Sequence, residues 1–100
     1  MWEPISEDEL KELIDRELVQ CSIEQQKFFA KYRVPFYKVP IHRLGGIGEV
    51  FVAAELPSGV IYYEDVEGGF EFDRLGPDGA IPTQGCNQYE LRHVLSQIKL

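Results

Sequence analysis

The four residues Gln84-Gly85-Cys86-Asn87 carry the side chains of this sequence that could act together in nucleophilic chemistry. Asn87, with Glu90 three positions later, predicts a helix start and would place Cys86 just before the helix N-terminus. The positive end of a helix dipole lowers the pKa of a nearby thiol, and the Gln84 amide could donate a hydrogen bond to an oxyanion. These residues predict a thiol-dependent enzyme as the alternative function of the chain.

The general base that such an enzyme needs is less well defined. His93 would lie about two turns up the same helix, too far from Cys86 to pair with it, so His42 is the remaining candidate. The order glutamine, glycine, cysteine before a helix is similar to that of papain-like enzymes, whose remaining signature is missing here. The simpler interpretation is that Cys86 packs against Leu91 as the apolar staple of the helix.

A glycine-rich stretch from Leu44 to Ala53, LGGIGEVFVA, is similar to the phosphate-binding loop of protein kinases with two loop residues deleted. A kinase also needs a lysine on a following strand, and no lysine occurs between Lys38 and Lys99. No Gly-Lys-Ser or Gly-Lys-Thr triplet appears, which excludes a Walker loop. We therefore predict that the glycines allow a sharp bend at the entry to a β-strand, and we predict no cofactor.

Length and composition describe a single ordinary domain. The chain has 100 residues, a hydrophobic fraction of 44% and two cysteines, which suits one core in a reducing compartment. No apolar run approaches the ~20 residues of a membrane-spanning helix, and the N-terminus is acidic where a secretory leader would be basic. His42 and His93 stand alone, so no metal site is predicted. We expect a cytoplasmic protein without membrane contact.

The net charge of −7 is distributed unevenly along the chain. Residues 1–24 hold eight acidic side chains against two basic ones, and residues 49–79 hold eight against Arg74 alone. Residues 25–48 hold five basic side chains and no acidic one. The sequence therefore predicts a segmentally polarised molecule, which points to electrostatic recognition of a partner.

Helices are predicted at both ends of the chain. Ser6 and Glu9 form a capping box, and apolar residues at helical spacing continue to about Arg33, just before a proline. We predict one long helix over this range. A second cap at Ser22, with Gln25 three positions later, offers the alternative of a break or kink.

Four strands are predicted between the helices. Two prolines bracket a short edge strand, and turn residues separate three further runs of β-forming residues. The predicted strands are residues 36–39, 49–56, 60–66 and 70–75, followed by a helix from Asn87. The order α-β-β-β-β-α predicts one α+β domain over residues 1–100, with an antiparallel meander covered on one face by the N-terminal and C-terminal helices.

Two-residue turns at Pro57-Ser58 and Gly68-Gly69 would fix how the strands alternate. In that register Glu64 lies directly opposite Asp73, a pairing of like charges that destabilises a sheet. The predicted core face carries Val50, Val52, Ala54, Leu56, Ile61, Tyr63, Phe70 and Phe72. The predicted outer face carries Glu49, Phe51, Ala53, Glu55, Val60, Tyr62, Glu64, Val66, Glu71 and Asp73.

The predicted outer face combines carboxylates with aromatic side chains. Such a face either keeps the sheet soluble or docks a cationic partner, with aromatic residues supplying contact area and carboxylates steering the encounter. We predict that a basic protein docks on Glu49, Phe51, Glu55, Tyr62, Glu64, Glu71 and Asp73. In size, acidity and α+β build the chain resembles bacterial immunity proteins and antitoxins, and this resemblance implies an inhibitor of a basic toxin.

Three other uses of the charged residues compete with this prediction. The stretch KFFAKYR, residues 27–33, interleaves cations with aromatics as single-strand binders do. However, Phe28 and Tyr32 at helical spacing predict core residues, and a net charge of −7 opposes nucleic-acid binding. The basic segment of one copy could instead meet the acidic face of another in a homodimer. Glu64 and Asp73 could act as acid and base, but an open strand face offers no cleft to desolvate them.

Overall fold

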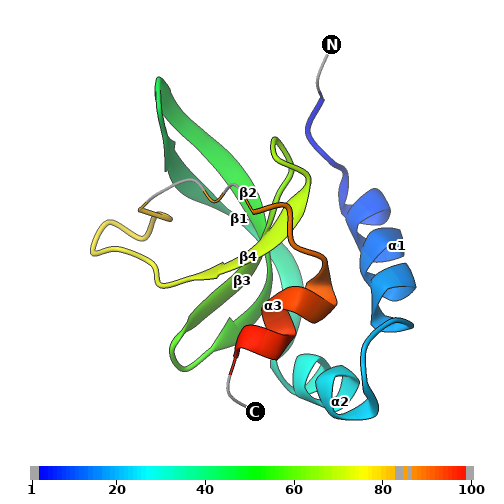
Figure 1. The fold of residues 1–100 in the computed structure, drawn as a ribbon. Helices are drawn as coiled ribbons and strands as arrows, with labels where there is room; N and C mark the ends of the chain where they lie inside the picture. The colour runs from blue at the N-terminus through cyan, green and yellow to red at the C-terminus, as the bar shows by residue number, and fades with distance from the viewer. Residues whose placement is uncertain (1–2, 83–84, 86, 99–100) are drawn as a thin grey trace.

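The computed structural model describes residues 3–82, 85 and 87–98, which form three helices and one antiparallel sheet of four strands. The elements are α1 (Glu7–Leu18), α2 (Ile23–Tyr32), β1 (Arg33–Arg43), β2 (Gly46–Leu56), β3 (Gly59–Glu64), β4 (Gly69–Asp73) and α3 (Leu91–Gln97). Figure 1 shows the three helices on one side of the sheet and the segment that follows β4 on the other. The predicted α+β class is confirmed.

The predicted long N-terminal helix is wrong, because the chain breaks between α1 and α2. Both capping boxes form: Ser6 caps α1 with Glu9, and Ser22 caps α2 with Gln25. The Gln26 amide then donates to the backbone oxygens of Leu18 and Cys21, at 2.9 and 3.2 Å. The second cap prevails because these side-chain hydrogen bonds replace the backbone bonds that a continuous helix would have made.

Strand β1 lies at the edge of the sheet, as predicted, but it spans 11 residues rather than the short segment between the prolines. Pro35 falls in the irregular stretch between Arg33 and Tyr37, where β1 has no regular partner on β2. The backbone of Pro40 points away from β2, since its carbonyl oxygen accepts a hydrogen bond from the Ile81 amide outside the sheet. Neither proline therefore removes a bond from the ladder, and the strand can run through both.

One of the two predicted hairpin turns is confirmed, and the other is wrong. Leu56 pairs with Gly59, so Pro57-Ser58 is the two-residue turn between β2 and β3. Glu64 pairs with Gly69, so the turn between β3 and β4 has four residues, and Asp73 pairs with Val60 instead of Glu64. The predicted like-charge pair does not exist, because the longer turn moves the register.

The sheet separates two hydrophobic cores. The helix-side core consists of Leu10, Ile14, Cys21, Phe29, Ala53, Ala54, Ile61, Phe70, Leu91, Val94 and Leu95. The second core, on the face away from the helices, consists of Val39, Ile41, Val50, Val52, Val60, Tyr62 and Ile81. The sheet is therefore buried on both faces, where the sequence predicted one buried face and one exposed face.

A bulge in β2 explains why two valines and their neighbours were assigned to the wrong faces. The register shifts between Val52 and Ala54, so alternation restarts at that point. Val50 and Val52 belong to the second core, while Ala53 belongs to the helix-side core and Phe51 packs against it. The predicted core residues beyond the bulge do face the helices: Ala54, Leu56, Ile61, Tyr63, Phe70 and Phe72.

The chain after β4 covers the second core and reaches both edges of the sheet. Ile81 forms a parallel bridge with Ile41 on β1, and Tyr89 forms an antiparallel bridge with Phe70 on β4. The last helix consequently begins at Leu91, with Glu90 as its N-cap, and the predicted start at Asn87 is wrong. Among the described residues, no helix is long and apolar enough to cross a membrane.

Candidate binding groove

The seven residues predicted to bind a partner do not share one exposed face. Tyr62, Glu64 and Glu71 are buried, with 1%, 0% and 8% of their surface exposed. Together with Glu55 and Asp73 they lie on the face of the second core, whereas Glu49 and Phe51 lie on the other face of the sheet. The predicted outer face is wrong, because the bulge in β2 inverts the alternation and the chain after β4 covers its middle.

Glu64 is held inside the protein by an ion pair. Its Oε1 atom lies 2.7 Å from Nη2 of Arg43, a side chain that is itself 15% exposed. The arginine passes over Gly48, where a Cβ atom would come within 2.6 Å of Arg43 Nε. Val66 N–H donates to the same carboxylate oxygen at 3.3 Å. These contacts assign Glu64 a structural role, since a buried charge with this partner has no access to a docked protein.

Glu71 is covered by the segment that precedes α3. Its two carboxylate oxygens accept hydrogen bonds from the backbone amide and the side-chain amide of Asn87, at 3.2 and 3.4 Å. Gly85 lies so close that a Cβ atom there would be 2.5 Å from Glu71 Cδ. Burial, reinforced by the nearby carboxylate of Glu71, raises the pKa of Tyr62 well above its ordinary value, so the phenol stays neutral.

Glu55 and Asp73 lie at the rim of the second core. Glu55 is exposed, and burial of the Tyr37 phenol, together with the nearby Glu55 carboxylate, raises the pKa of Tyr37. Asp73 is half-buried and accepts the backbone N–H of Arg74 at 2.7 Å. These two carboxylates remain near solvent on either side of Val60, at the edge of the group that Tyr62 and Glu71 form.

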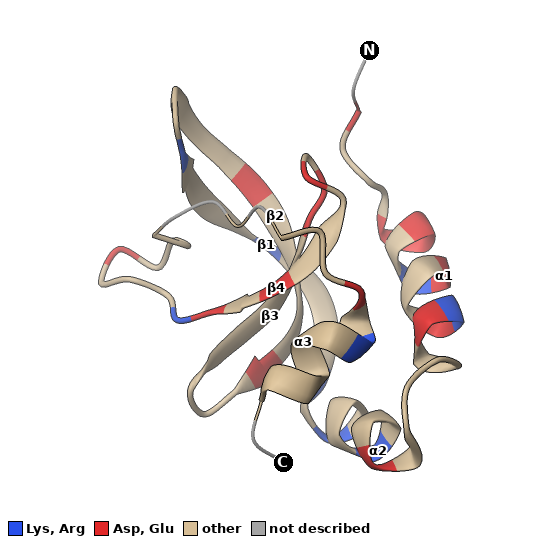
Figure 2. Cartoon of the chain, viewed as in Figure 1, with Lys and Arg blue, Asp and Glu red and all other residues tan. Residues whose placement is uncertain are grey.

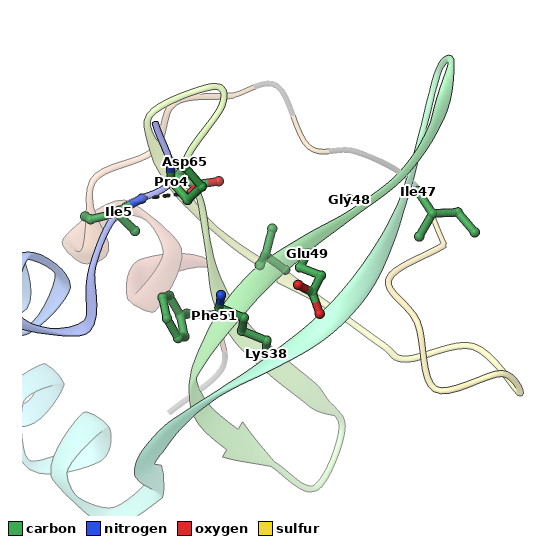
Figure 3. A pocket seen from close by; sticks show the side chains of 9 residues that line it. Pro4, Ile5, Lys38, Ile47, Gly48, Glu49, Phe51 and Asp65 are labelled. Atoms are coloured by element: carbon green, nitrogen blue, oxygen red, sulfur yellow. Dashed lines mark hydrogen bonds between the residues drawn. The ribbon is translucent and has the colours of Figure 1, made fainter. Parts of the chain in front are cut away.

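Glu49 and Phe51 line a groove of about 310 Å³ on the helix side of the sheet, beyond the helices themselves. One wall comes from the β1–β2 hairpin and the other from the N-terminal segment and the β3–β4 turn, as Figure 3 shows. The lining residues are Pro4, Ile5, Lys38, Ile47, Gly48, Glu49, Val50, Phe51 and Asp65. The groove combines apolar side chains with two carboxylates and one lysine.

The N-terminal segment is fixed to the β3–β4 turn, which gives the groove its second wall. The backbone N–H of Ile5 donates to Asp65 Oδ2 at 3.2 Å, and the side chain of Ile5 packs against the helix-side core. A second hollow of about 220 Å³ adjoins the groove, because Pro4, Ile5 and Asp65 line both. Its other lining residues include Glu3 and Glu9.

Four carboxylates, those of Glu3, Glu9, Glu49 and Asp65, therefore line two adjoining hollows that contain one lysine. Hydrogen bonds from Ser6 lower the pKa of Glu9, so this carboxylate is ionised at neutral pH. Figure 2 shows acidic residues on α1, on the β3–β4 turn and on β2, and basic residues on α2 but also on α1 and α3. The acidic residues around the groove therefore lie in a fold whose charges are unevenly distributed but not separated into two ends.

The basic stretch of residues 27–33 contributes to the core as predicted. Phe28 and Tyr32 pack against the helix-side core, with their ring centroids 5.0 Å apart. Lys31 lies over the Tyr32 ring, at 5.2 Å from its centroid, and Arg33 lies over the Phe29 ring at 5.3 Å. The aromatic side chains are therefore engaged within the fold and are not presented as a row of stacking platforms.

The residues proposed for thiol chemistry are not brought together by the described part of the chain. Cys86 and Gln84 lie outside the described residues, and the helix that was to activate the thiol begins at Leu91. The ring of His42 bonds to Asp78 at 2.9 Å, and His93 accepts the backbone N–H of Glu90 at 3.2 Å. Within the described ranges, no group of three or more potential metal ligands occurs.

Comparison of the chain with protein-family models, with curated proteins and with solved structures finds no match in any of the three.

Proposed function

We propose that this protein is a binding module that docks a basic segment of a partner protein in the groove between its N-terminal segment and its β1–β2 hairpin. The observation that carries the proposal is that four acidic residues, together with Phe51 and Ile5, line two adjoining hollows. Carboxylates beside an aromatic ring and aliphatic side chains suit a lysine or arginine whose charged end and apolar stem are both contacted.

The tip of the β1–β2 hairpin extends this surface. Leu44 and Ile47 are 104% and 70% exposed, and Ile47 also lines the groove. Leu44 and Gly45 form the two-residue turn at the tip, and Gly45 and the first strand residue Gly46 adopt positive φ angles of 99° and 151° that glycine permits. Exposed apolar side chains beside an acidic groove favour a protein partner over a nucleic acid, since the four carboxylates would repel phosphates.

The acidity of the whole chain supports the same proposal. A net charge of −7 attracts a basic partner over a long range and speeds the encounter, and salt weakens that attraction. An inhibitor role follows if the docked segment belongs to the partner's functional surface. The identity of the partner decides between a toxin inhibitor and another regulatory role.

The test compares two charge reversals on the same strand. Glu49→Lys places a cation in the groove, whereas Glu55→Lys makes the same charge change on the opposite face of the sheet. We expect Glu49→Lys to weaken binding of a basic partner by about tenfold or more, because a like charge at a docked contact costs over 1 kcal/mol. Glu55→Lys should change the affinity only through the overall charge.

The measurement uses tagged wild-type protein and both variants, with partners captured from cell lysate at low and high salt and identified by mass spectrometry. The affinity of each captured basic protein is then measured by titration with the purified pair. Equal affinity of the two variants would overturn the proposal, and selective loss with Glu55→Lys would move the docking surface to the other face. Circular dichroism of both variants checks that they are folded.

A further inference from the structure

Among the residues that line the groove, Lys38 lies over the aromatic ring of Phe51. Lys38 on β1 and Phe51 on β2 are direct partners in the sheet, and their side chains lie on the same face. The Lys38 Nζ atom is 5.3 Å from the centroid of the Phe51 ring. This is the distance at which a cation is attracted to the face of an aromatic ring.

The ring of Phe51 is held in position from within the protein. Phe51 packs against the helix-side core, and its ring centroid lies 6.1 Å from that of Phe36. Glu49, two residues along the same strand, lies on the same face and also lines the groove. A positioned ring beside a carboxylate is a receptor for one cationic side chain, and in the free protein Lys38 fills it (Figure 3).

We propose that the face of Phe51 is the position at which the groove takes a single arginine or lysine side chain of the partner, and that Lys38 competes for this position from within the same chain. This inference rests on the proposed function and adds its recognition element and its internal competitor. When the partner docks, its cation replaces Lys38 over the ring. Lys38 is exposed, so it can swing into solvent without disturbing the core.

Competition between Lys38 and a partner cation for the Phe51 ring affects both the affinity and the selectivity of the groove. The ammonium ion lowers the attraction of the groove for any cation that does not displace it. A partner that offers one well-placed basic side chain is therefore favoured over one that offers only diffuse positive charge. Removing Lys38 should relax this selectivity as well as raise the affinity.

The experiment uses an acetylated and amidated hexa-arginine peptide as the probe. The peptide is titrated into wild type, Lys38→Met and Lys27→Met, with binding followed by calorimetry and by the NMR shifts of the Phe51 ring protons. Lys27→Met is the matched control, because it removes the same charge from an exposed position on α2. Both variants retain a long apolar side chain, so the comparison isolates the position of the charge.

We expect Lys38→Met to bind the peptide roughly twofold to fivefold more tightly than Lys27→Met, which is the change that one exposed cation–π contact produces. The Phe51 ring protons should shift in unbound Lys38→Met relative to wild type, and shift again when the peptide binds. Phe51→Leu should remove the difference between the lysine variants, provided that thermal unfolding confirms its fold. If Phe51→Leu does not fold, the comparison of Lys38→Met with Lys27→Met still tests the proposal.

Equal peptide affinity of Lys38→Met and Lys27→Met would overturn the proposed competition. If Glu49→Lys still weakens peptide binding relative to Glu55→Lys in that case, the groove remains the docking site and only the role of Lys38 falls. If the Glu49 and Glu55 variants also bind equally, the proposed function itself is wrong. The two pairs of variants therefore separate the two failures.

Discussion

The carboxylates of the second core and those of the groove come from the same acidic stretches of sequence but meet different surroundings. Glu64 and Glu71 are buried, and their oxygens contact Arg43 and Asn87 within the fold. Glu49 stands exposed in the wall of an open groove. An interleaving of acidic and aromatic residues thus has no fixed meaning, because coverage by other segments decides whether a carboxylate stabilises the fold or can meet a partner.

The largest expected change in the free energy of unfolding comes from a substitution in the second core, and it distinguishes this region from the groove. Arg43→Met leaves the carboxylate of Glu64 buried without its partner, and this should lower the free energy of unfolding by about 3–5 kcal/mol. Urea denaturation measures the change. The double variant Arg43→Met with Glu64→Leu should recover much of the loss, since an apolar pair of similar size carries no unpaired charge. A single variant as stable as wild type would show that the ion pair is not buried in solution.

A smaller loss is expected at Glu71. Glu71→Ala removes both hydrogen bonds to Asn87 and should cost about 2 kcal/mol in the free energy of unfolding. Asp73→Ala is the matched control, because Asp73 lies on the same strand and face but is half-buried and bonds to its neighbour Arg74. Equal losses in the two variants would contradict the coverage of Glu71 by the segment before α3.

Glu17 on α1 is half-buried, intermediate in exposure between the buried carboxylates of the second core and the exposed Glu49, and the pH dependence of stability tests its environment. It accepts the backbone N–H of Leu91 at the start of α3, and burial raises its pKa. The folded state therefore holds this proton more tightly than the unfolded state, so stability falls as pH rises from about 4.3 through the raised pKa. Glu17→Gln keeps an acceptor but has no charge, and the difference between the two unfolding free energies should grow over that window. Parallel curves would show that the carboxylate is solvated.

The smallest stability effect is expected in the groove. Glu49→Lys should change the free energy of unfolding by no more than about 0.5 kcal/mol, as is usual for an exposed side chain. Thermal and urea unfolding measure this change beside the binding experiment. A large loss would make Glu49 part of the structure and remove the contrast between the groove and the second core.

The local features of the fold could be predicted from the sequence because neighbouring residues determine them. The capping box at Ser6 and the turn at Pro57-Ser58 need only residues within one turn of the chain. The bulge before Ala54 and the bridge from Ile81 to β1 depend on packing between distant segments. Strict alternation through β2 consequently gave the wrong faces, and an expected exposed face became a second core.

The groove was predictable in part for the same reason. Glu49 and Phe51 do share one face of one strand as predicted, but that face is the helix side and not the predicted outer side, and Lys38, Ile5 and Asp65 come from three other segments. Lys38 becomes a neighbour of Phe51 only through the register of β1 on β2. The two-residue turn at Leu44-Gly45 sets that register, and the two prolines in β1 argued against a strand long enough to reach Lys38 from that turn.

The bridges made by Ile81 and Tyr89 also bear on how copies of this chain behave when crowded. One lies on the outer edge of β1 and the other on the outer edge of β4, although the two residues are close together in the sequence. Each occupies backbone groups that could otherwise pair with a strand of another molecule. Loss of both bridges would free backbone groups on each edge of the sheet for pairing with a strand of another molecule.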